Sequence, residues 1–249
     1  MMQLFKRLLF SAALSCGVVN LSAYAAQVSL YDASQGNLPA QQGSLVFANF
    51  GTSETLAPAG VDLDSAPLDS NRGGYTAVLT SLNRNTGVNL DFALQIQSES
   101  HLGNANRAGF STILLTNDNF GIELGFWENT IFAQDASFTS AESISFDTTG
   151  ALTSFSLQIL GSDYSLVANG LPILGGSLRD YSTSGVIVFG IPIYQISNYL
   201  FLGDDTQSAQ AQVTLGDISI TTSVVPVPPS ILLMLSACLA LASRRQLSA

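Results

Sequence analysis

The chain has 249 residues, of which 10% are charged and 9% aromatic, and its formal net charge is −10. All 18 acidic residues lie between the two end segments, where only four arginines and no lysine accompany them, so this middle region carries a net charge of −14. Such a composition excludes a disordered chain, and such a charge repels phosphate backbones, which makes nucleic acid a poor partner.

The first 25 residues have the pattern of a secretory signal peptide. Lys6 and Arg7 precede an apolar stretch over residues 8–19, and the small residues Ala23 and Ala25 fit cleavage by signal peptidase before Ala26. A lipoprotein is the alternative, with Cys16 as the acylated residue, but the three residues before this cysteine lack the usual branched apolar side chain. We therefore expect an exported protein with a signal peptide over residues 1–25.

The two cysteines, Cys16 and Cys238, both lie in the end segments. A mature domain over residues 26–222 therefore has no disulfide, no zinc–thiolate site and no catalytic thiol. We expect no cofactor and no metal, and we expect the fold to depend on its hydrophobic core.

Alternating apolar residues predict strands throughout residues 26–222. In residues 89–96 the side chains of Leu90, Phe92, Leu94 and Ile96 share one face, and residues 154–159 repeat this period. Near residue 216 the alternation shifts phase at Gly216-Asp217, as a bulge or turn would cause. No useful 3.6-residue period is present, so the sequence predicts an all-β fold of two antiparallel sheets, a sandwich or barrel.

Three stretches, residues 101–134, 164–181 and 198–220, resemble the concanavalin A-like, laminin G-like jelly roll of bacterial choice-of-anchor proteins. The most specific part of the resemblance is the phrase Leu-Gly-Asp-Asp-Thr at residues 202–206. The resemblance implies a lectin-like sandwich and a surface location but names no ligand, because the fold class holds lectins, adhesive modules and glucanases.

The carboxylates do not form an expected catalytic pair. Glu123 and Glu128 are five residues apart and face opposite sides of a continuous strand, whereas a glucanase needs two carboxylates in one cleft. His101 is the only histidine, and we interpret it as a solvated loop residue. We therefore expect no enzymatic activity.

Five residues are candidates for ligand binding: Trp127, Glu123, Arg107, Asp204 and Asp205. The side chains of Trp127 and Glu123 lie on the face opposite the apolar face of residues 122–126. On that face an indole beside a carboxylate could stack on a sugar ring. The alternative is that a loop or the second sheet covers the indole. Asp204 and Asp205 would ligate calcium or cap a turn, and Arg107 would form a structural ion pair or bind an anion.

The last 27 residues, 223–249, begin with a proline motif, continue with a hydrophobic stretch and close with a basic pair shortly before the final residue. Residues 224–242 would span roughly 28 Å as a helix, although the uninterrupted apolar part over residues 231–242 is short for a bilayer. This order resembles the PEP-CTERM sorting signal that an exosortase recognises, with the motif residues Val225, Pro226, Val227, Pro228, Pro229, Ser230, Arg244 and Arg245. Val227 replaces the glutamate typical of the family, and a plain C-terminal membrane anchor is the alternative.

These observations predict a jelly-roll sandwich between a signal peptide and a hydrophobic sorting helix. The expected protein is a non-enzymatic surface component, processed by signal peptidase and an exosortase, that adheres to extracellular polysaccharide and is held at the membrane by its tail. The alternatives are a structural matrix protein without a discrete ligand and a degenerate glycoside hydrolase.

Overall fold

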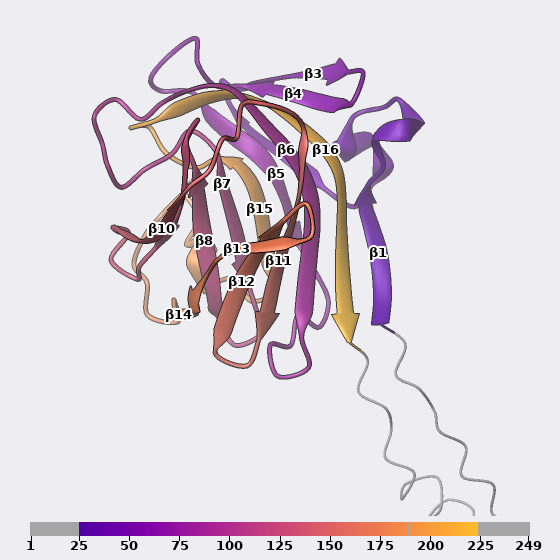
Figure 1. Cartoon of the computed structure of the whole chain (residues 1–249), viewed down its shortest axis with the longest axis vertical. Coiled ribbons are helices and arrows are strands. Elements are labelled where there is room, and N and C mark those ends of the chain that lie inside the picture. Colours follow the sequence, from indigo (N-terminus) through magenta and orange to yellow (C-terminus); the bar gives the residue numbers. More distant parts are fainter. Residues whose placement is uncertain (1–24, 189, 224–249) are drawn as a thin grey trace, which may run out of the picture. The chain divides into compact units, whose positions relative to one another are not determined.

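The computed structural model describes residues 25–188 and 190–223, which form two antiparallel sheets packed face to face (Figure 1). Sheet A consists of β1 (Ala25–Tyr31), β3 (Ser53–Ala57), β4 (Gly60–Asp64), β6 (Val88–Ser100), β11 (Thr153–Leu160), β12 (Asp163–Ala168), β13 (Leu171–Ser177) and β16 (Gln210–Ser223). Sheet B consists of β2 (Val46–Phe50), β5 (Arg72–Val78), β7 (Ser111–Leu115), β8 (Phe120–Phe126), β9 (Thr130–Gln134), β10 (Ser140–Ser145), β14 (Arg179–Asp180) and β15 (Tyr199–Asp204).

The strand order differs from the sequence order in both sheets, as long-range crossovers require. Sheet A has the order β13-β12-β11-β6-β16-β4-β3, with β1 paired to β16, and sheet B has the order β10-β9-β8-β7-β15-β5-β2, with β14 paired to β8. The helices within the described ranges are three short 3₁₀ turns, η1 (Ala33–Gln35), η2 (Pro39–Gln42) and η3 (Ile193–Gln195). The predicted all-β, two-sheet antiparallel fold is confirmed.

The period of two in the sequence decides which side chains enter the core. Along β6 the residues Leu90, Phe92, Leu94 and Ile96 are all buried, and their neighbours on the other face are partly exposed. In β11 the residues Phe155, Leu157 and Ile159 behave in the same way, as their alternation predicted.

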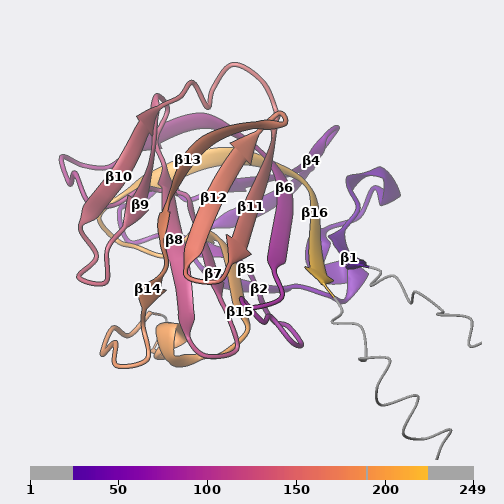
Figure 2. The same ribbon diagram turned by 60° about the horizontal axis from the view of Figure 1, so that its bottom comes forward.

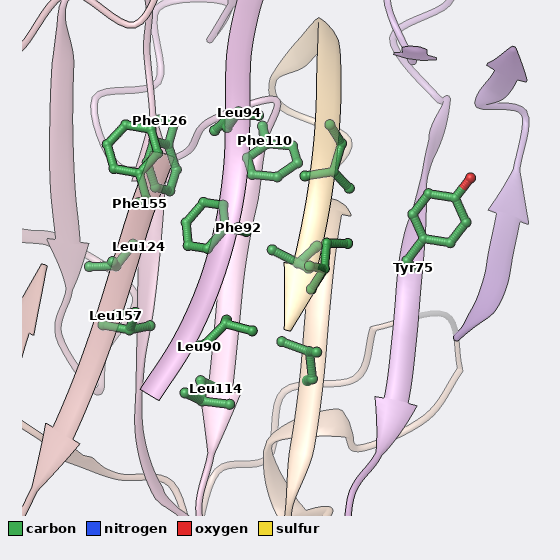
Figure 3. Packing of buried hydrophobic residues seen from close by; sticks show 14 of the residues in the cluster. Tyr75, Leu90, Phe92, Leu94, Phe110, Leu114, Leu124, Phe126, Phe155 and Leu157 are labelled. Carbon is green, nitrogen blue, oxygen red and sulfur yellow. The ribbon is translucent and has the colours of Figure 1, made fainter. Parts of the chain in front are cut away.

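The core between the sheets is rich in aromatic contacts (Figure 3). The Phe92 ring of sheet A stacks on Phe155 with a centroid separation of 5.5 Å and meets the edge of Phe126 from sheet B at 6.0 Å. Phe110 also packs against Phe126, at 5.8 Å. Because such offset and edge-to-face pairs add to the free energy of burial, they join the two sheets as well as filling the space between them.

The predicted bulge lies where the alternation changes phase. Leu215 pairs with Leu94 and Ile218 with Phe92, so Gly216 and Asp217 together lie opposite Ala93 and β16 has one extra residue there. The insertion keeps Ile218 buried on the same side of the sheet as Leu215, in agreement with the sequence prediction.

Both ends of the described domain leave from one end of the sandwich. Ala25 pairs with Ser223, and Thr222 pairs with Val88 at the start of β6, whereas Gln210 at the start of β16 pairs with Ser100. The 14 residues of β16 extend over about 45 Å, so they separate a proximal end, where the chain enters and leaves, from a distal end. The distal end carries the loop 101–110 and the turn 205–209 (Figure 1).

All of the predicted signal peptide except Ala25, and all of the predicted sorting segment except residue 223, lie outside the described residues. This includes the cleavage residue Ala23 and the whole motif from Val225 to Arg245. Among residues 25–188 and 190–223, no helix is long and apolar enough to span a bilayer.

Candidate functional site

A long loop covers the outer face of sheet B. This strap, defined here as residues 181–188 and 190–198, follows β14, which pairs with β8 (Figure 2). Its apolar side chains pack on the outer-face residues of β7 and β15 in a second core, made of Ile113, Leu115, Tyr181, Val188, Ile193, Tyr194, Tyr199 and Phe201. The outer face of β8 is therefore buried beneath a loop, which was one of the two alternatives that the sequence left open.

Glu123 lies beneath this strap. The residues on either side of it, Ile122 and Leu124, face the core between the sheets, so Glu123 points outward from β8, yet it is completely buried. The hydroxyl of Tyr194, from η3 in the strap, hydrogen bonds with Oε2 of Glu123, and Nη1 of Arg107 lies 3.7 Å from Oε1.

Asp205, directly after β15, completes this carboxylate cluster. Its Oδ2 lies 3.4 Å from the hydroxyl of Tyr194, and the Ser111 hydroxyl lies beside both carboxyl groups. The structure thus brings together three predicted site residues, Arg107, Glu123 and Asp205, from separate segments around one tyrosine. The tyrosine is a site residue that the sequence analysis missed.

The pKa values of Glu123, Asp205 and Tyr194 in this cluster are all raised. Burial, together with the nearby Asp205, raises the pKa of Glu123 to about 8, against the opposing effect of Arg107. Burial also raises the pKa of Asp205, and burial with the two carboxyls raises the pKa of Tyr194 well above its ordinary value. The raised pKa of Glu123 favours its protonated form at neutral pH, and the Tyr194 hydroxyl bridges the carboxyl groups of Glu123 and Asp205.

Asp204 lies on the other side of the strand from Asp205, because successive side chains alternate in direction. It lines a small cavity with Ser65 and Gly73, and its Oδ1 accepts a hydrogen bond of 3.0 Å from the backbone N–H of Thr206. Burial raises its pKa to about 8. Asp204 therefore caps a turn, as one of the two sequence interpretations held, and its side chain points to the opposite side of the strand from that of Asp205.

A pocket of about 350 Å³ opens at the distal end, beside the carboxylate cluster. We call it the distal pocket; it is lined by Arg72, Arg107, Val186, Ile187, Val188, Asp205, Thr206, Gln207 and Ser208. Its lining combines two arginines, a run of hydroxyl and amide side chains, and an aliphatic ledge contributed by the strap. The volume is within the range of small-ligand sites.

The polar wall of the pocket is held by its own hydrogen bonds. The hydroxyls of Thr206 and Ser208 are 2.9 Å apart, and Nδ2 of Asn104 donates to Oγ of Ser208 at 3.2 Å. Gln207 is exposed between them, so its amide faces solvent. Sequence reasoning did not single out Gln207, Ser208 or the ledge, because their proximity to Arg107 depends on the course of the strap.

Trp127 is near the distal end but is not an open platform. The His101 ring stacks on the indole with a centroid separation of 4.3 Å, and Phe132 packs against it at 4.9 Å. Its Nε1 donates to the backbone carbonyl of Arg107 at 2.8 Å. The indole thus supports the loop that carries Arg107, and His101, which we interpreted as a solvated loop residue, is a stacking partner with a side chain only 38% exposed.

A second hollow, of about 730 Å³, crosses the outer face of sheet A. Its lining includes Asp91, Ser156, Gln158 and Asp217. Several of its polar groups satisfy one another: Nδ2 of Asn89 donates to both oxygens of Asp91 at 2.9 Å, and Ser156 donates to Asn89 at 2.6 Å. This sheet A groove is larger than the distal pocket but contains no cation among its lining residues.

Comparison with solved structures finds the same fold in proteins of very different sequence. A carbohydrate esterase from the Shiga toxin-encoding bacteriophage phi24B superposes with a TM-score of 0.53 and 13% identity, covering 80% of this chain and 100% of that one. A Bacillus subtilis protein of unknown function with a galectin-like fold gives 0.50 and 10%, with coverages of 81% and 100%. The carbohydrate recognition domain of Emp46p gives 0.50 and 8%, with coverages of 79% and 97%.

These similarities establish a galectin-like and concanavalin A-like sandwich, as the sequence resemblance implied, and at such low identity they establish the fold alone. No protein-family model matches the chain, and no curated protein matches it.

Proposed function

We propose that this protein is an exported, non-enzymatic glycan-binding protein of the cell envelope or extracellular matrix, and that its distal pocket holds the glycan. The distal pocket is the observation that carries the proposal. Donors and acceptors with fixed geometry converge there beside an aliphatic ledge, and sugar binding requires this combination, because a sugar ring presents hydroxyls at its edge and C–H groups on its face. The groove on sheet A also has apolar side chains in its lining, such as Val167 and Pro172, but it has no arginine there.

The fold supports this proposal by analogy. The Emp46p domain of similar architecture is a carbohydrate recognition domain, and the phage protein is described as a carbohydrate esterase. Sandwiches of this kind therefore bind or modify carbohydrates in other proteins. The proposal that this chain binds a glycan depends on its own pocket.

The direction of the chain supports display at a surface. Ala25 and Ser223 leave the sandwich together at the proximal end, whereas the turn 205–209 lies at the distal end. The chain thus continues beyond Ser223 from the end of the sandwich opposite the distal pocket. This arrangement fits a signal peptidase cut before Ala26 and sorting by an exosortase through the C-terminal motif.

The carboxylate cluster favours binding over catalysis. Glu123 and Asp205 are bridged by the Tyr194 hydroxyl, which places them close enough for a retaining glycosidase. They are, however, 0% and 6% exposed, and Tyr194 occupies the position that a substrate would need. We therefore propose that the pair fixes Arg107 and the strap, and that the protein does not hydrolyse glycans.

A matched pair of glutamine substitutions tests the proposed function. Gln207→Trp fills the distal pocket from an exposed position, and Gln158→Trp makes the same change at an exposed position in the sheet A groove. On an array of neutral and acidic glycans, we expect the wild type and Gln158→Trp to bind the same structures and Gln207→Trp to lose them. A wild type that binds no glycan would refute the proposal and favour a structural matrix protein.

A further inference from the structure

We propose that the distal pocket selects glycans that present a uronic acid, that is, a sugar ring carrying one carboxylate. This inference rests on the proposed glycan binding and adds the chemical class of the ligand. The inference depends on where the arginines lie, on the exposure of Arg107, and on the uncharged residues that line the rest of the pocket.

Positive charge is scarce in this domain and is concentrated at the pocket. Between residues 25 and 223 the sequence has four arginines and no lysine, against 18 acidic residues. Two of the four, Arg72 and Arg107, line the distal pocket. Arg107 is also 3.7 Å from Glu123, and the other two arginines lie elsewhere, Arg84 beside Asp118 and Arg179 beside Glu142. An anion is repelled by most of this surface and attracted at this pocket.

Arg107 is more exposed at the pocket than the two carboxyl groups beside it, and its guanidinium is positioned by Gln134, Glu123 and the ring of Phe138. The Arg107 side chain is 22% exposed, whereas Asp205 is 6% exposed and Glu123 is fully buried. Asp205 is also in the lining of the pocket, and its carboxyl contacts Tyr194 and Ser111. Burial raises the pKa of Glu123 to about 8 and also raises the pKa of Asp205, so these two neighbours offset the charge of Arg107 less than ionised carboxylates would. A planar guanidinium held in this way suits a carboxylate ligand.

The remaining lining fits the rest of a sugar ring. Thr206, Gln207 and Ser208 offer hydroxyl and amide groups to the ring hydroxyls, and Val186 to Val188 offer aliphatic surface to its C–H face. Ile187 is 60% exposed, so this surface is available to a ligand. A simple anion such as phosphate would use the arginines and leave the ledge uncovered, whereas a uronic acid uses both.

The test compares three probes that differ only at one group. A trisaccharide ending in glucuronic acid, its methyl ester, and the same trisaccharide ending in glucose are titrated into the full chain in detergent micelles at pH 7. We expect the free acid to bind about 10- to 100-fold more tightly than the ester and the glucoside, because one charge-assisted contact is worth this much. The ester and the glucoside should bind with similar affinity.

Substitutions of single arginines show which side chain causes the preference for the free acid. Arg72→Gln should reduce the preference for the free acid to a few-fold or less, and Arg107→Lys, which keeps the charge but loses the planar fork, should reduce it in part. Arg84→Gln is the matched control, because it removes the same charge from a side chain that is 21% exposed and far from the pocket. It should leave the preference unchanged. The unfolding midpoint of each variant, followed by the fluorescence of Trp127, shows that it is folded.

The two proposals fail in different ways. Equal binding of the acid, ester and glucoside would overturn the uronic acid inference and leave glycan binding intact. A preference for the acid that is lost equally in Arg84→Gln would also overturn it, because the effect would then be one of net charge. Failure of all three probes, together with no binding on the glycan array, would overturn both proposals.

Discussion

Replacing Glu123 with glutamine tests the buried carboxylate cluster, because the amide resembles a carboxyl that never loses its proton. In the folded protein the pKa of Glu123 is raised from 4.5 to about 8 by burial and by Asp205. A raised pKa means that the folded state binds the proton more tightly than the unfolded state. The contribution of Glu123 to stability is therefore complete below about pH 4.5 and decreases as the pH rises toward 8.

The expected size follows from this shift. At roughly 1.4 kcal/mol per pKa unit, the change corresponds to a loss of about 5 kcal/mol between pH 4.5 and pH 8 or above. This is a large fraction of the ~5 to 15 kcal/mol that stabilises a typical domain. Glu123→Gln should lack this loss, so its stability relative to the wild type should increase steadily from pH 5 to pH 9. Near pH 5 the two proteins should differ by about 1 kcal/mol or less.

Urea denaturation at a series of pH values measures this difference. Trp127 is the only tryptophan of the chain, so its fluorescence reports on this domain. Glu128→Gln, an exposed glutamate just beyond the same strand, is the control and should keep the pH dependence of the wild type. Burial also raises the pKa of Asp204, so the wild type and both variants share that part of the decrease. A difference between Glu123→Gln and the wild type that does not change with pH would refute the protonated cluster.

Three other predictions concern the fold and its location. Gly203→Ala should destabilise the domain by at least ~2 kcal/mol in thermal denaturation, because Gly203 has φ +153° and an added Cβ would lie 2.5 Å from the Cα of Gly74. Gly185→Ala is the control and should leave the stability unchanged, because no residue apart from its chain neighbours has a heavy atom within 4 Å of the added Cβ. Residues 25–223 produced alone should give an all-β far-ultraviolet circular dichroism spectrum, because the sheets supply their own core, and a helical spectrum would contradict this. Protease added to intact spheroplasts should degrade the domain if the protein is exported, whereas full protection would contradict export.

The sequence predicted the core strands well because burial on one face imposes a period of two. The alternation in β6 and β11 identified the buried residues, and the phase change at Gly216-Asp217 identified the bulge. These features are local, so the pattern of neighbouring residues contains them.

The candidate site was less predictable because its parts are distant in sequence. Arg107, Glu123 and Asp205 were each selected as candidates, but their meeting around Tyr194 depends on the order β8-β7-β15 and on the course of the strap. The alternation in β8 places Glu123 on the outer face, and alternation alone does not show that a loop some 70 residues later covers that face. The apolar run at residues 186–193 was the available signal, since a loop so apolar needs a surface to cover.

The most direct test of the central proposal is to locate a bound glycan by ¹⁵N chemical-shift mapping, with a glycan identified on the array. The account predicts that the largest shifts occur at the backbone amides of Thr206, Gln207 and Ser208 and at the guanidinium of Arg107. Shifts confined to the sheet A groove, at residues such as Asp91 and Ser156, would contradict it, because they would assign glycan binding to the opposite sheet.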